Sequence, residues 1–336
     1  MNMMIVLFVT LVMTIGLLGD TMDKVLKNSV NVNVLDQVNK GDIKFESVQD
    51  RQKYIDVQKD FEYKTLGLNE PWYSPTRFLN TLFKVAILDL GNSHFFTTDS
   101  GSSSVRDIII ERIPKTLLLF TTSTIVITII GLFLGAFVAS KAGSIWDRTN
   151  SALAVFSTSF PIWWIGMLMI YAFAFVYHIF PSRSTPLTSP SDVSYISDLL
   201  YHMILPFMTL ILVGFGSWAY IVRYFVERFL SEDYIVSKRA IGISKRKILY
   251  SHALKNAAPP IVTIIALSLA TSFGGAITVE AVFDWPGIGK LYYDAIGLSD
   301  VPIIIGLTYV STLIFVVAIF ITDLFYVFFD PRIKAR

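Results

Sequence analysis

Long uncharged runs alternate with shorter charged stretches along this chain of 336 residues. A hydrocarbon core about 30 Å thick is crossed by about 20 consecutive apolar residues in a helix. Five runs meet that length, at residues 116–140, 149–177, 199–222, 257–279 and 301–322. A sixth, at residues 1–19, is near the lower limit. The pattern predicts an all-α polytopic membrane protein with six transmembrane helices.

The run at residues 1–19 has two interpretations. We interpret it as a first transmembrane helix that stays in the protein. A signal peptide is the alternative, but no basic residue precedes the run and no Ala-x-Ala-like site stands before Asp20. The missing basic arm is also what a start site placed too late would give.

Residues 20–115 differ in kind, with 14 acidic and 13 basic residues and no further apolar run long enough to span. The pattern predicts an extracytoplasmic aqueous segment between the first helix and a core at residues 116–336. Within the segment, Glu46 to Thr65 has the spacing of a helix. Residues 21–45 match no element that we can name.

Composition supports a membrane protein and narrows its chemistry. Hydrophobic residues make up 53% and charged residues 16%, a balance that soluble globular domains do not have. The net charge of +2 gives no sign of a nucleic-acid partner. With no cysteine, the chain has no disulfide framework, catalytic thiol or cysteine metal site.

The distribution of basic residues sets an expected orientation. If both termini are cytoplasmic, the inner loops carry 13 Lys or Arg and the short outer loops carry 2. The inner loops are then residues 141–148, 223–256 and 330–336. This asymmetry is the one that the positive-inside rule predicts, and the long segment at 20–115 is exempt from it.

Catalytic motifs are absent from the sequence. The nearest match to a phosphate-binding loop is Gly289-Lys290, but Asp284 stands in place of its first glycine and Leu291 in place of its hydroxyl residue. No H-E-x-x-H or G-x-S-x-G motif occurs either. We therefore expect no catalytic residue, cofactor or metal, and any ATP hydrolysis must belong to another subunit.

The most informative loop is residues 233–260, which is too charged to cross a bilayer. Asp233 to Ile241 predicts a short helix, Gly242 its end, and Ser244 the cap of a second helix. The apolar face of the second helix holds Ile248, Leu249, Ala253 and Asn256, and the basic face holds Lys245, Arg246, Lys247 and Tyr250. Such an element lies on a membrane or fits a partner's groove. A plain solvated connector is the alternative.

A few other residues have both a functional and a structural interpretation. Glu280, beside the turn Trp285-Pro286-Gly287, is a candidate gate or docking contact. His202 and Asp323 lie near span ends, where a structural role, such as pairing of Asp323 with Arg332, competes with ligation or proton relay. Glycines occur in pairs at 131 and 135, 214 and 216, and 274 and 275, and helix bending and close packing explain them equally well.

Several ordered stretches resemble the permease subunits of binding-protein-dependent ABC transporters, in their dipeptide, oligopeptide and nickel branch. They are DYI, RAIG and HALKNA in the loop, LGLNEPWY, DLGNS, ERIPKTL, LGAFVASKAGSIWDR and SFPIWWIGML before it, and WPG, DAI and DPR after it. The chain departs from the general loop signature at Val236, Ser237 and Lys238, where that signature has Glu-Ala-Ala, and at Lys255, where it has proline.

The resemblance implies an importer in the plasma membrane of a prokaryote. A second, similar permease would complete the pathway, two ATPase subunits would dock at the loop, and a solute-binding protein would deliver the cargo outside. The residues implied in ATPase coupling are Asp233, Tyr234, Ala240, Gly242, Ile248, Leu249, His252, Ala253, Leu254 and Asn256. The cargo is a peptide, an oligosaccharide or nickel. A passive channel and an intramembrane enzyme remain the rival classes.

Overall fold

A computed structural model describes residues 47–65, 68–93 and 95–329, with isolated positions between 5 and 38, and the backbone alone from 322 to 329. The chain divides into two compact units, one of residues 1–110 and 294–313 and the other of residues 111–293 and 314–336. Within the described residues there is no β-strand, and Asn92 and Ser104 form an isolated bridge. The predicted all-α class is confirmed.

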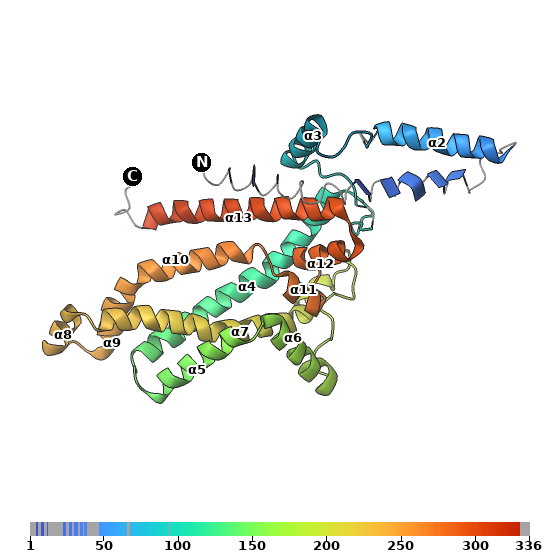
Figure 1. The fold of residues 1–336 in the computed structure, drawn as a ribbon. Coiled ribbons are helices and arrows are strands. Elements are labelled where there is room, and N and C mark those ends of the chain that lie inside the picture. Colours follow the sequence, from blue (N-terminus) through green and yellow to red (C-terminus); the bar gives the residue numbers. More distant parts are fainter. Residues whose placement is uncertain are drawn as a thin grey trace. The chain divides into compact units, whose positions relative to one another are not determined.

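The helices follow one another along the chain as Figure 1 labels them. They are α2 (Val48–Thr65), α3 (Pro75–Ala86), α4 (Val105–Ala139), α5 (Ile145–Ser159), α6 (Ile162–Ile170), the π-helix η1 (Tyr171–Val176), α7 (Tyr195–Leu230), α8 (Asp233–Ala240), α9 (Lys245–Ile248), the π-helix η2 (Leu249–Ala253), α10 (Leu254–Ser272), α11 (Ile277–Phe283), α12 (Ile288–Leu298) and α13 (Val301–Phe329).

Four helical runs in the described chain are long and apolar enough to cross a membrane. They are Val105–Ala139, Tyr195–Leu230, Lys245–Ser272 and Val301–Ile321. A bent pair, Ile145–Ser159 with Ile162–Val176, raises the number to five if it counts as one span. The predicted first helix, residues 1–19, lies largely outside the described residues. A multi-pass membrane protein is therefore confirmed, whereas six spans remain a prediction.

The predicted span at 149–177 is bent at Pro161 rather than straight. It breaks after Ser159 and bends by 94° before α6 begins. Proline has no N–H to continue a helix, and it forces the preceding residue toward extended geometry. Accordingly Phe160 has φ −114° and ψ 135°, and Pro161 caps α6.

The helices of the other spans begin before their uncharged runs or end at other residues than predicted. Helix α4 starts at Val105 rather than at 116, and α7 covers Tyr195–Leu230 rather than 199–222. The predicted span 257–279 belongs to a run that starts at Lys245 and ends at Ser272. Helical hydrogen bonds are internal to the helix, so a span continues into water where charged residues begin. The second helix of the loop is consequently the first part of a span.

In the first unit, α2 confirms the helix expected at Glu46 to Thr65. Its buried Ile55 packs with Val30, Val34, Val38 and Leu68. The unit also holds Asp300, whose fully buried carboxylate accepts a 2.6 Å hydrogen bond from Ser93 Oγ. The DLGNS segment is thereby fixed to the residues just before α13.

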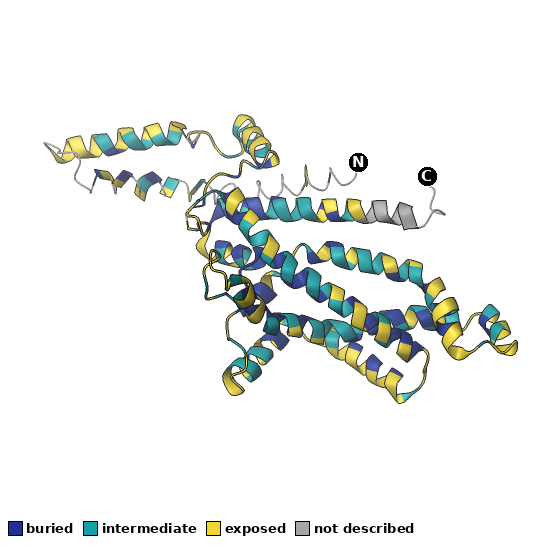
Figure 2. Ribbon diagram, turned by 180° about the vertical axis from the view of Figure 1, so that it is seen from behind, coloured by how far each residue is buried: buried dark blue, intermediate teal, exposed yellow. Residues whose placement is uncertain are grey.

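In the second unit, close approach explains the paired glycines of α4 and α7. A Cβ added to Gly131 would lie 2.6 Å from the ring of Trp218, and one added to Gly214 would lie 2.6 Å from Ile127. These distances leave no room for a side chain, which favours the packing interpretation over bending. Figure 2 shows buried residues recurring along the long helices.

Candidate functional site

The α8–α9 loop has the predicted arrangement of helix, glycine and helix, at the ends of α7 and α10 (Figure 1). Gly242 has φ +82°. Its N–H donates to Arg239 O at 3.0 Å, and the N–H of Ile243 donates to Lys238 O at 3.1 Å. These two bonds form a Schellman motif, whose glycine position favours a left-handed backbone. Gly242 therefore ends α8, and Ser244 Oγ caps α9 by accepting from Lys247 N at 3.4 Å.

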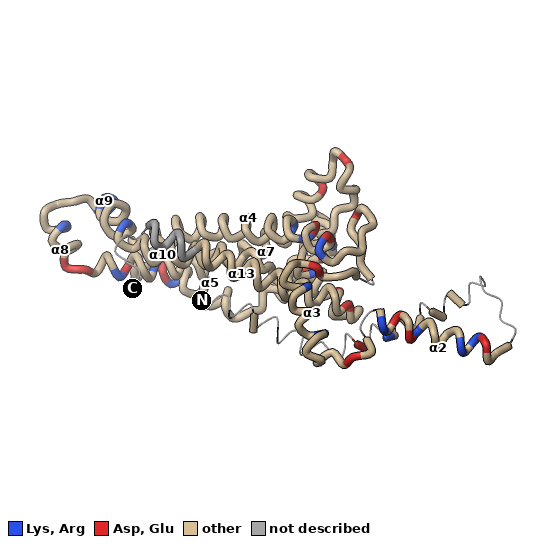
Figure 3. Tube along the Cα trace, turned by 90° about the horizontal axis from the view of Figure 1, so that it is seen from above, with Lys and Arg blue, Asp and Glu red and all other residues tan. Residues whose placement is uncertain are grey.

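The tip of this loop is open to its surroundings. None of the described atoms lies within 4 Å of the position that a Cβ on Gly242 would take. Ile241 is 76% exposed and Val236 is 57% exposed. Lys245, Arg246 and Lys247 are exposed beside them, and Figure 3 shows basic residues on this part of the chain. The tip is thus an apolar and basic surface.

The apolar face of the second helix is not part of that surface, which corrects the prediction of a face for a groove or membrane. Ile248 is 1% exposed. Leu249 and Ala253 pack in a cluster with Val222 and Val226 of α7. Burying apolar side chains against a neighbouring helix stabilises the chain itself. These three residues therefore belong to the core of the second unit.

The remaining residues predicted for coupling divide into three groups. Asn256 Nδ2 donates to Tyr234 Oη at 2.7 Å, which joins α10 to α8 within the loop. Asp233 and Ala240 are exposed, while His252 and Leu254 are half-buried. The first pair braces the loop, and Asp233 and Ala240 lie on its outer surface.

An ion pair that the sequence analysis missed closes the turn between α4 and α5. Arg223 Nε lies 2.6 Å from Asp147 Oδ1, and Arg223 Nη2 donates to Asp147 Oδ2 at 2.9 Å. Gly143 N also donates to Oδ2, at 2.8 Å, and Glu227 pairs with Arg223 at 2.9 Å. The pair therefore combines one hydrogen bond, from Nη2 to Oδ2, with a close ionic contact between Nε and Oδ1. No spacing signal in the sequence connects residues 76 positions apart.

Glu280 is the centre of a second, buried arrangement. Its side chain is fully buried, with 0% exposure. Oε2 accepts from the N–H groups of Gly289 and Lys290 at 2.8 and 3.1 Å, and Oε1 accepts from Thr116 Oγ1 at 3.0 Å. Thr116 in turn accepts from Ile288 N at 2.8 Å. The carboxylate therefore satisfies the free N–H groups at the start of α12 and links them to α4.

Glycines make room for this carboxylate. A Cβ on Gly287 would overlap Glu280 Oε2 and Thr116 Oγ1, and one on Gly275 would lie 2.6 Å from Glu280 Oε1. Trp285 is buried too, and its Nε1 donates to Lys115 O at 3.0 Å. The turn at 285–287 is thus packed inside the second unit. Sequence motifs mark this turn as a candidate, whereas no local pattern marks Thr116.

Burial also changes the ionisation of Glu280, which lies outside the long apolar helices. Desolvation raises its pKa from 4.5 to about 7, and the hydrogen bonds from Lys290, Thr116 and Gly289 oppose this only in part. Because Glu280 and Trp285 have no exposed surface, they do not offer a direct docking contact in this conformation. A role for Glu280 in gating stays a prediction.

The other ionisable residues of interest are placed differently. His202 is 4% exposed, and its Nδ1 lies 2.9 Å from Asp198 Oδ1 one turn earlier in α7. Asp198 also accepts from Leu187 N at 2.7 Å and thereby holds the loop before α7. His202 is a buried structural partner, and the described residues contain no cluster that would hold a metal. The proposed pair of Asp323 and Arg332 lies outside the described side chains.

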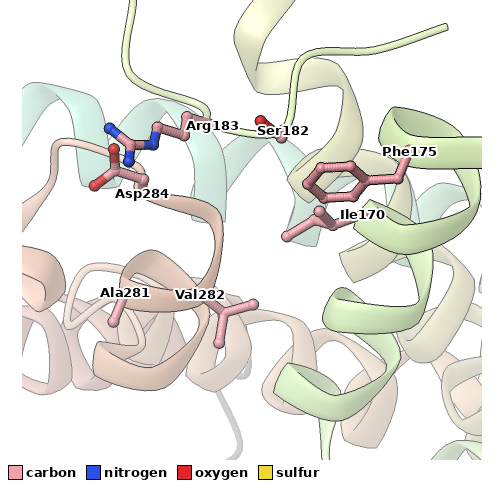
Figure 4. Close-up of a pocket in the computed structure, with 7 residues that line it drawn as sticks. All are labelled: Ile170, Phe175, Ser182, Arg183, Ala281, Val282 and Asp284. Carbon is pink, nitrogen blue, oxygen red and sulfur yellow. The ribbon is translucent and has the colours of Figure 1, made fainter. Parts of the chain in front are cut away.

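Two of the cavities that described residues line open on the second unit. The first, of about 450 Å³, has Arg183 and Asp284 on one side and Phe175 and Ile170 on the other (Figure 4). Asp284 is already engaged by Lys290 Nζ at 3.0 Å. The second, of about 440 Å³, runs between α4, α6, α7, α10 and α11 and is mainly apolar. Its polar lining comes from Thr124, Thr128, Ser217, Trp218, Ser268, Thr271 and Ser272.

Comparison with known proteins agrees with this architecture. Residues 131–335 match the family described as the inner membrane component of binding-protein-dependent transport systems. The chain belongs to this family. It is a permease subunit with several membrane-spanning helices.

Individual relatives are similar in sequence to this chain over most of their length. The oligopeptide transport system permease protein AppB of Bacillus subtilis is 30% identical over 86% of this chain and 86% of its own. The dipeptide transport system permease protein DppB of Escherichia coli is 32% identical over 81% of this chain and 84% of its own. A putative peptide permease of Brucella suis is 35% identical over 80% of this chain and 82% of its own.

Proposed function

We propose that this permease is one of the two membrane subunits of an ATP-driven importer of peptides. The observation that carries the proposal is the identity of 30–35% over at least four-fifths of the chain to proteins named as oligopeptide, dipeptide or peptide permeases. The chain supplies part of the pathway and no covalent chemistry. Oligosaccharides and nickel are the competing cargoes.

The proposed assembly has three kinds of subunit contact. A second, related permease completes the pathway, two ATPase subunits dock on the cytoplasmic side, and a solute-binding protein delivers the peptide outside. The helix at residues 1–19 would bring the spans to six, with both termini cytoplasmic. The ratio of 13 to 2 basic residues in the short loops supports this orientation.

In this assembly the ATPase contacts the tip of the α8–α9 loop. The exposed Val236, Ile241 and Gly242, with the basic residues of α9, supply the contact surface. Because α9, η2 and α10 form one helical run from Lys245 to Ser272, a force at the tip is passed along a continuous helix. Alternating access then follows from rigid displacement of that helix.

The mainly apolar cavity of about 440 Å³ supplies part of the pathway wall. Its hydroxyl groups, such as those of Thr124, Ser217 and Thr271, offer hydrogen bonds that a peptide backbone accepts and donates. Hydroxyl groups bind many side-chain types without a charge preference. A lining of this kind suits a permease that accepts peptides of varied sequence.

Uptake in proteoliposomes tests the cargo. The complete transporter, with its binding protein and both ATPases, should accumulate labelled di- and oligopeptides when ATP is supplied. Unlabelled peptides should compete, whereas nickel salts and oligosaccharides should not. This chain alone should neither hydrolyse ATP nor give flux. Competition by nickel or an oligosaccharide, without competition by peptides, would replace the proposed cargo.

Single cysteines test the topology, because the natural chain contains none. Cysteine in place of Ser47, Ser191 or Ser299 should react with an impermeant thiol reagent on whole cells. Cysteine in place of Ser244 should react only after the membrane is opened. Reaction at Ser244 in intact cells would reverse the proposed orientation.

A further inference from the structure

Helix α3 has an apolar arc that is wider than the surface its own chain covers. Phe78, Leu82 and Val85 lie on the covered side and are half-buried or buried. Leu79 and Phe83 of α3 and Ile87, its C-cap residue, are spaced by four residues and are 60%, 65% and 58% exposed. Residues four apart lie above one another on a helix, so these three form a continuous uncovered stripe.

The end of α3 is fixed to the first turns of α13, which belong to the same unit. Tyr309 Oη donates to Ala86 O at 3.1 Å. Leu90, just after α3, lies beside Gly306, where an added Cβ would be 3.1 Å from its Cδ1. Both contacts involve residues inside the apolar run Val301–Ile321. Helix α3 is therefore held against a membrane-spanning helix.

The contact with α13 lies in the half of the span that begins at Val301. Tyr309 lies eight residues after Val301, or about 12 Å along the helix axis at 1.5 Å per residue. Side chains on a helix lean toward its N-terminus, so the hydroxyl meets α3 nearer to the level of Val301 than its own Cα lies. Amphipathic helices at interfaces bury their apolar face about 5–10 Å into the boundary between headgroups and acyl chains.

The direction and composition of α3 fit the same place. Within the first unit α3 crosses the direction of the start of α13, nearly end-on in Figure 1 and sideways in Figure 3. Its sequence PTRFLNTLFKVA has two basic and no acidic residues. Lys84 is exposed on the polar arc, and Trp72 and Tyr73 precede the helix. Lysine at headgroup level and aromatic residues at the interface are both typical of helices that lie on membranes.

We propose that α3 is an interfacial helix whose Leu79, Phe83 and Ile87 insert into the lipid bilayer. The helix lies along the membrane surface nearest the start of α13, with Asn80 and Lys84 turned toward water. It thereby anchors the segment between the first two predicted spans to the lipid. The inference is independent of cargo and of ATPase docking.

Spin-label accessibility tests this placement in the complete transporter, reconstituted in vesicles of neutral and anionic phospholipid. Single cysteines replace Leu79, Phe83 and Ile87 on the apolar stripe and Asn80 and Lys84 on the matched polar arc. At the three stripe positions collisions with oxygen should exceed those with a water-soluble nickel chelate several-fold. The order should be reversed at Asn80 and Lys84.

Each other result overturns the proposal. Frequent collisions with the nickel chelate at all five positions would place the helix in water. Few collisions with either reagent at Leu79, Phe83 and Ile87 would mean that a protein partner covers the stripe. Because the labels sit on exposed positions, each variant should elute like wild type in size-exclusion chromatography, which confirms that the fold is intact.

Discussion

The α8–α9 loop and the turn at Glu280 both centre on a glycine, but for opposite physical reasons. At Gly242 the space for a side chain is empty, and the backbone angle of φ +82° is what favours glycine. At Gly287 the space is filled by Glu280 Oε2 and Thr116 Oγ1. An exposed glycine of the first kind allows a backbone conformation at a surface that another molecule contacts. A buried glycine of the second kind serves packing within the chain.

The difference separates two kinds of functional residue. Changes at the loop tip should alter contacts with partners while the permease stays folded. Changes at the buried turn should alter the permease itself. Five substitutions test this separation, from the largest expected effect to the smallest.

Ile248→Asp should destabilise the permease most, because it places a charge at a side chain that is 1% exposed. An unpaired buried charge costs about 3–5 kcal/mol. We expect little folded protein in fluorescence-detected size-exclusion chromatography. The matched change Ile241→Asp, at 76% exposure, should leave folding intact and reduce co-purification of the ATPase. Equal abundance of the two variants would contradict the assignment of Ile248 to the core.

Gly287→Ala should lower the melting temperature, because its Cβ overlaps Glu280 and Thr116. Forcing an extra methyl group into a packed site costs about 1–3 kcal/mol. The control is Gly297→Ala near the end of α12, where none of the described atoms lies within 4 Å of an added Cβ. That control should melt at or above the wild-type temperature. A normal melting temperature for Gly287→Ala would show that the site relaxes.

Glu280→Gln should change how stability depends on pH. Because burial raises the pKa of Glu280 from 4.5 to about 7, the folded protein holds this proton more tightly than the unfolded chain. Its stabilising effect is fully present below pH 4.5 and is lost as the pH rises through about 7. As the pH rises from 4.5 to about 7, the melting temperature of the wild type should therefore fall relative to that of Glu280→Gln. Parallel curves for the two proteins would contradict the raised pKa.

Gly242→Leu should weaken coupling while leaving the spans intact, because a non-glycine residue in the left-handed region costs about 1–2 kcal/mol. Gly242→Asn is the control, since asparagine tolerates this backbone conformation better. At matched membrane abundance, the Gly242→Leu variant should reduce peptide-stimulated ATP hydrolysis more than the Gly242→Asn variant does. If both variants lose activity equally, the constraint at this position is contact with the ATPase rather than the backbone angle.

Lys245→Ala should have the smallest effect, because Lys245 is exposed at the start of α9. Exposed charges contribute about 0–1 kcal/mol to an interaction. Co-purification with the ATPase should stay within about twofold of wild type, which corresponds to about 0.4 kcal/mol. A loss as large as that of Ile241→Asp would assign the docking energy to charge instead of to the apolar tip.

Local signals determined much of this protein from the sequence alone. Apolar run length located the later spans, since a bilayer requires a minimum length whatever the neighbours are. Gly242 and Ser244 predicted the end of α8 and the cap of α9, because both depend on bonds within a few residues. Short sequence motifs such as HALKNA, found in the expected order, indicated the family that the comparisons show.

Tertiary structure decided what depends on residues far apart in the chain. Helical spacing put Ile248, Leu249 and Ala253 on one face, but only their burial shows that the chain covers that face itself. Likewise Glu280 meets Thr116 across 164 positions, and Arg223 meets Asp147 across 76. A periodic pattern fixes which side chains share a face, whereas packing fixes what that face touches.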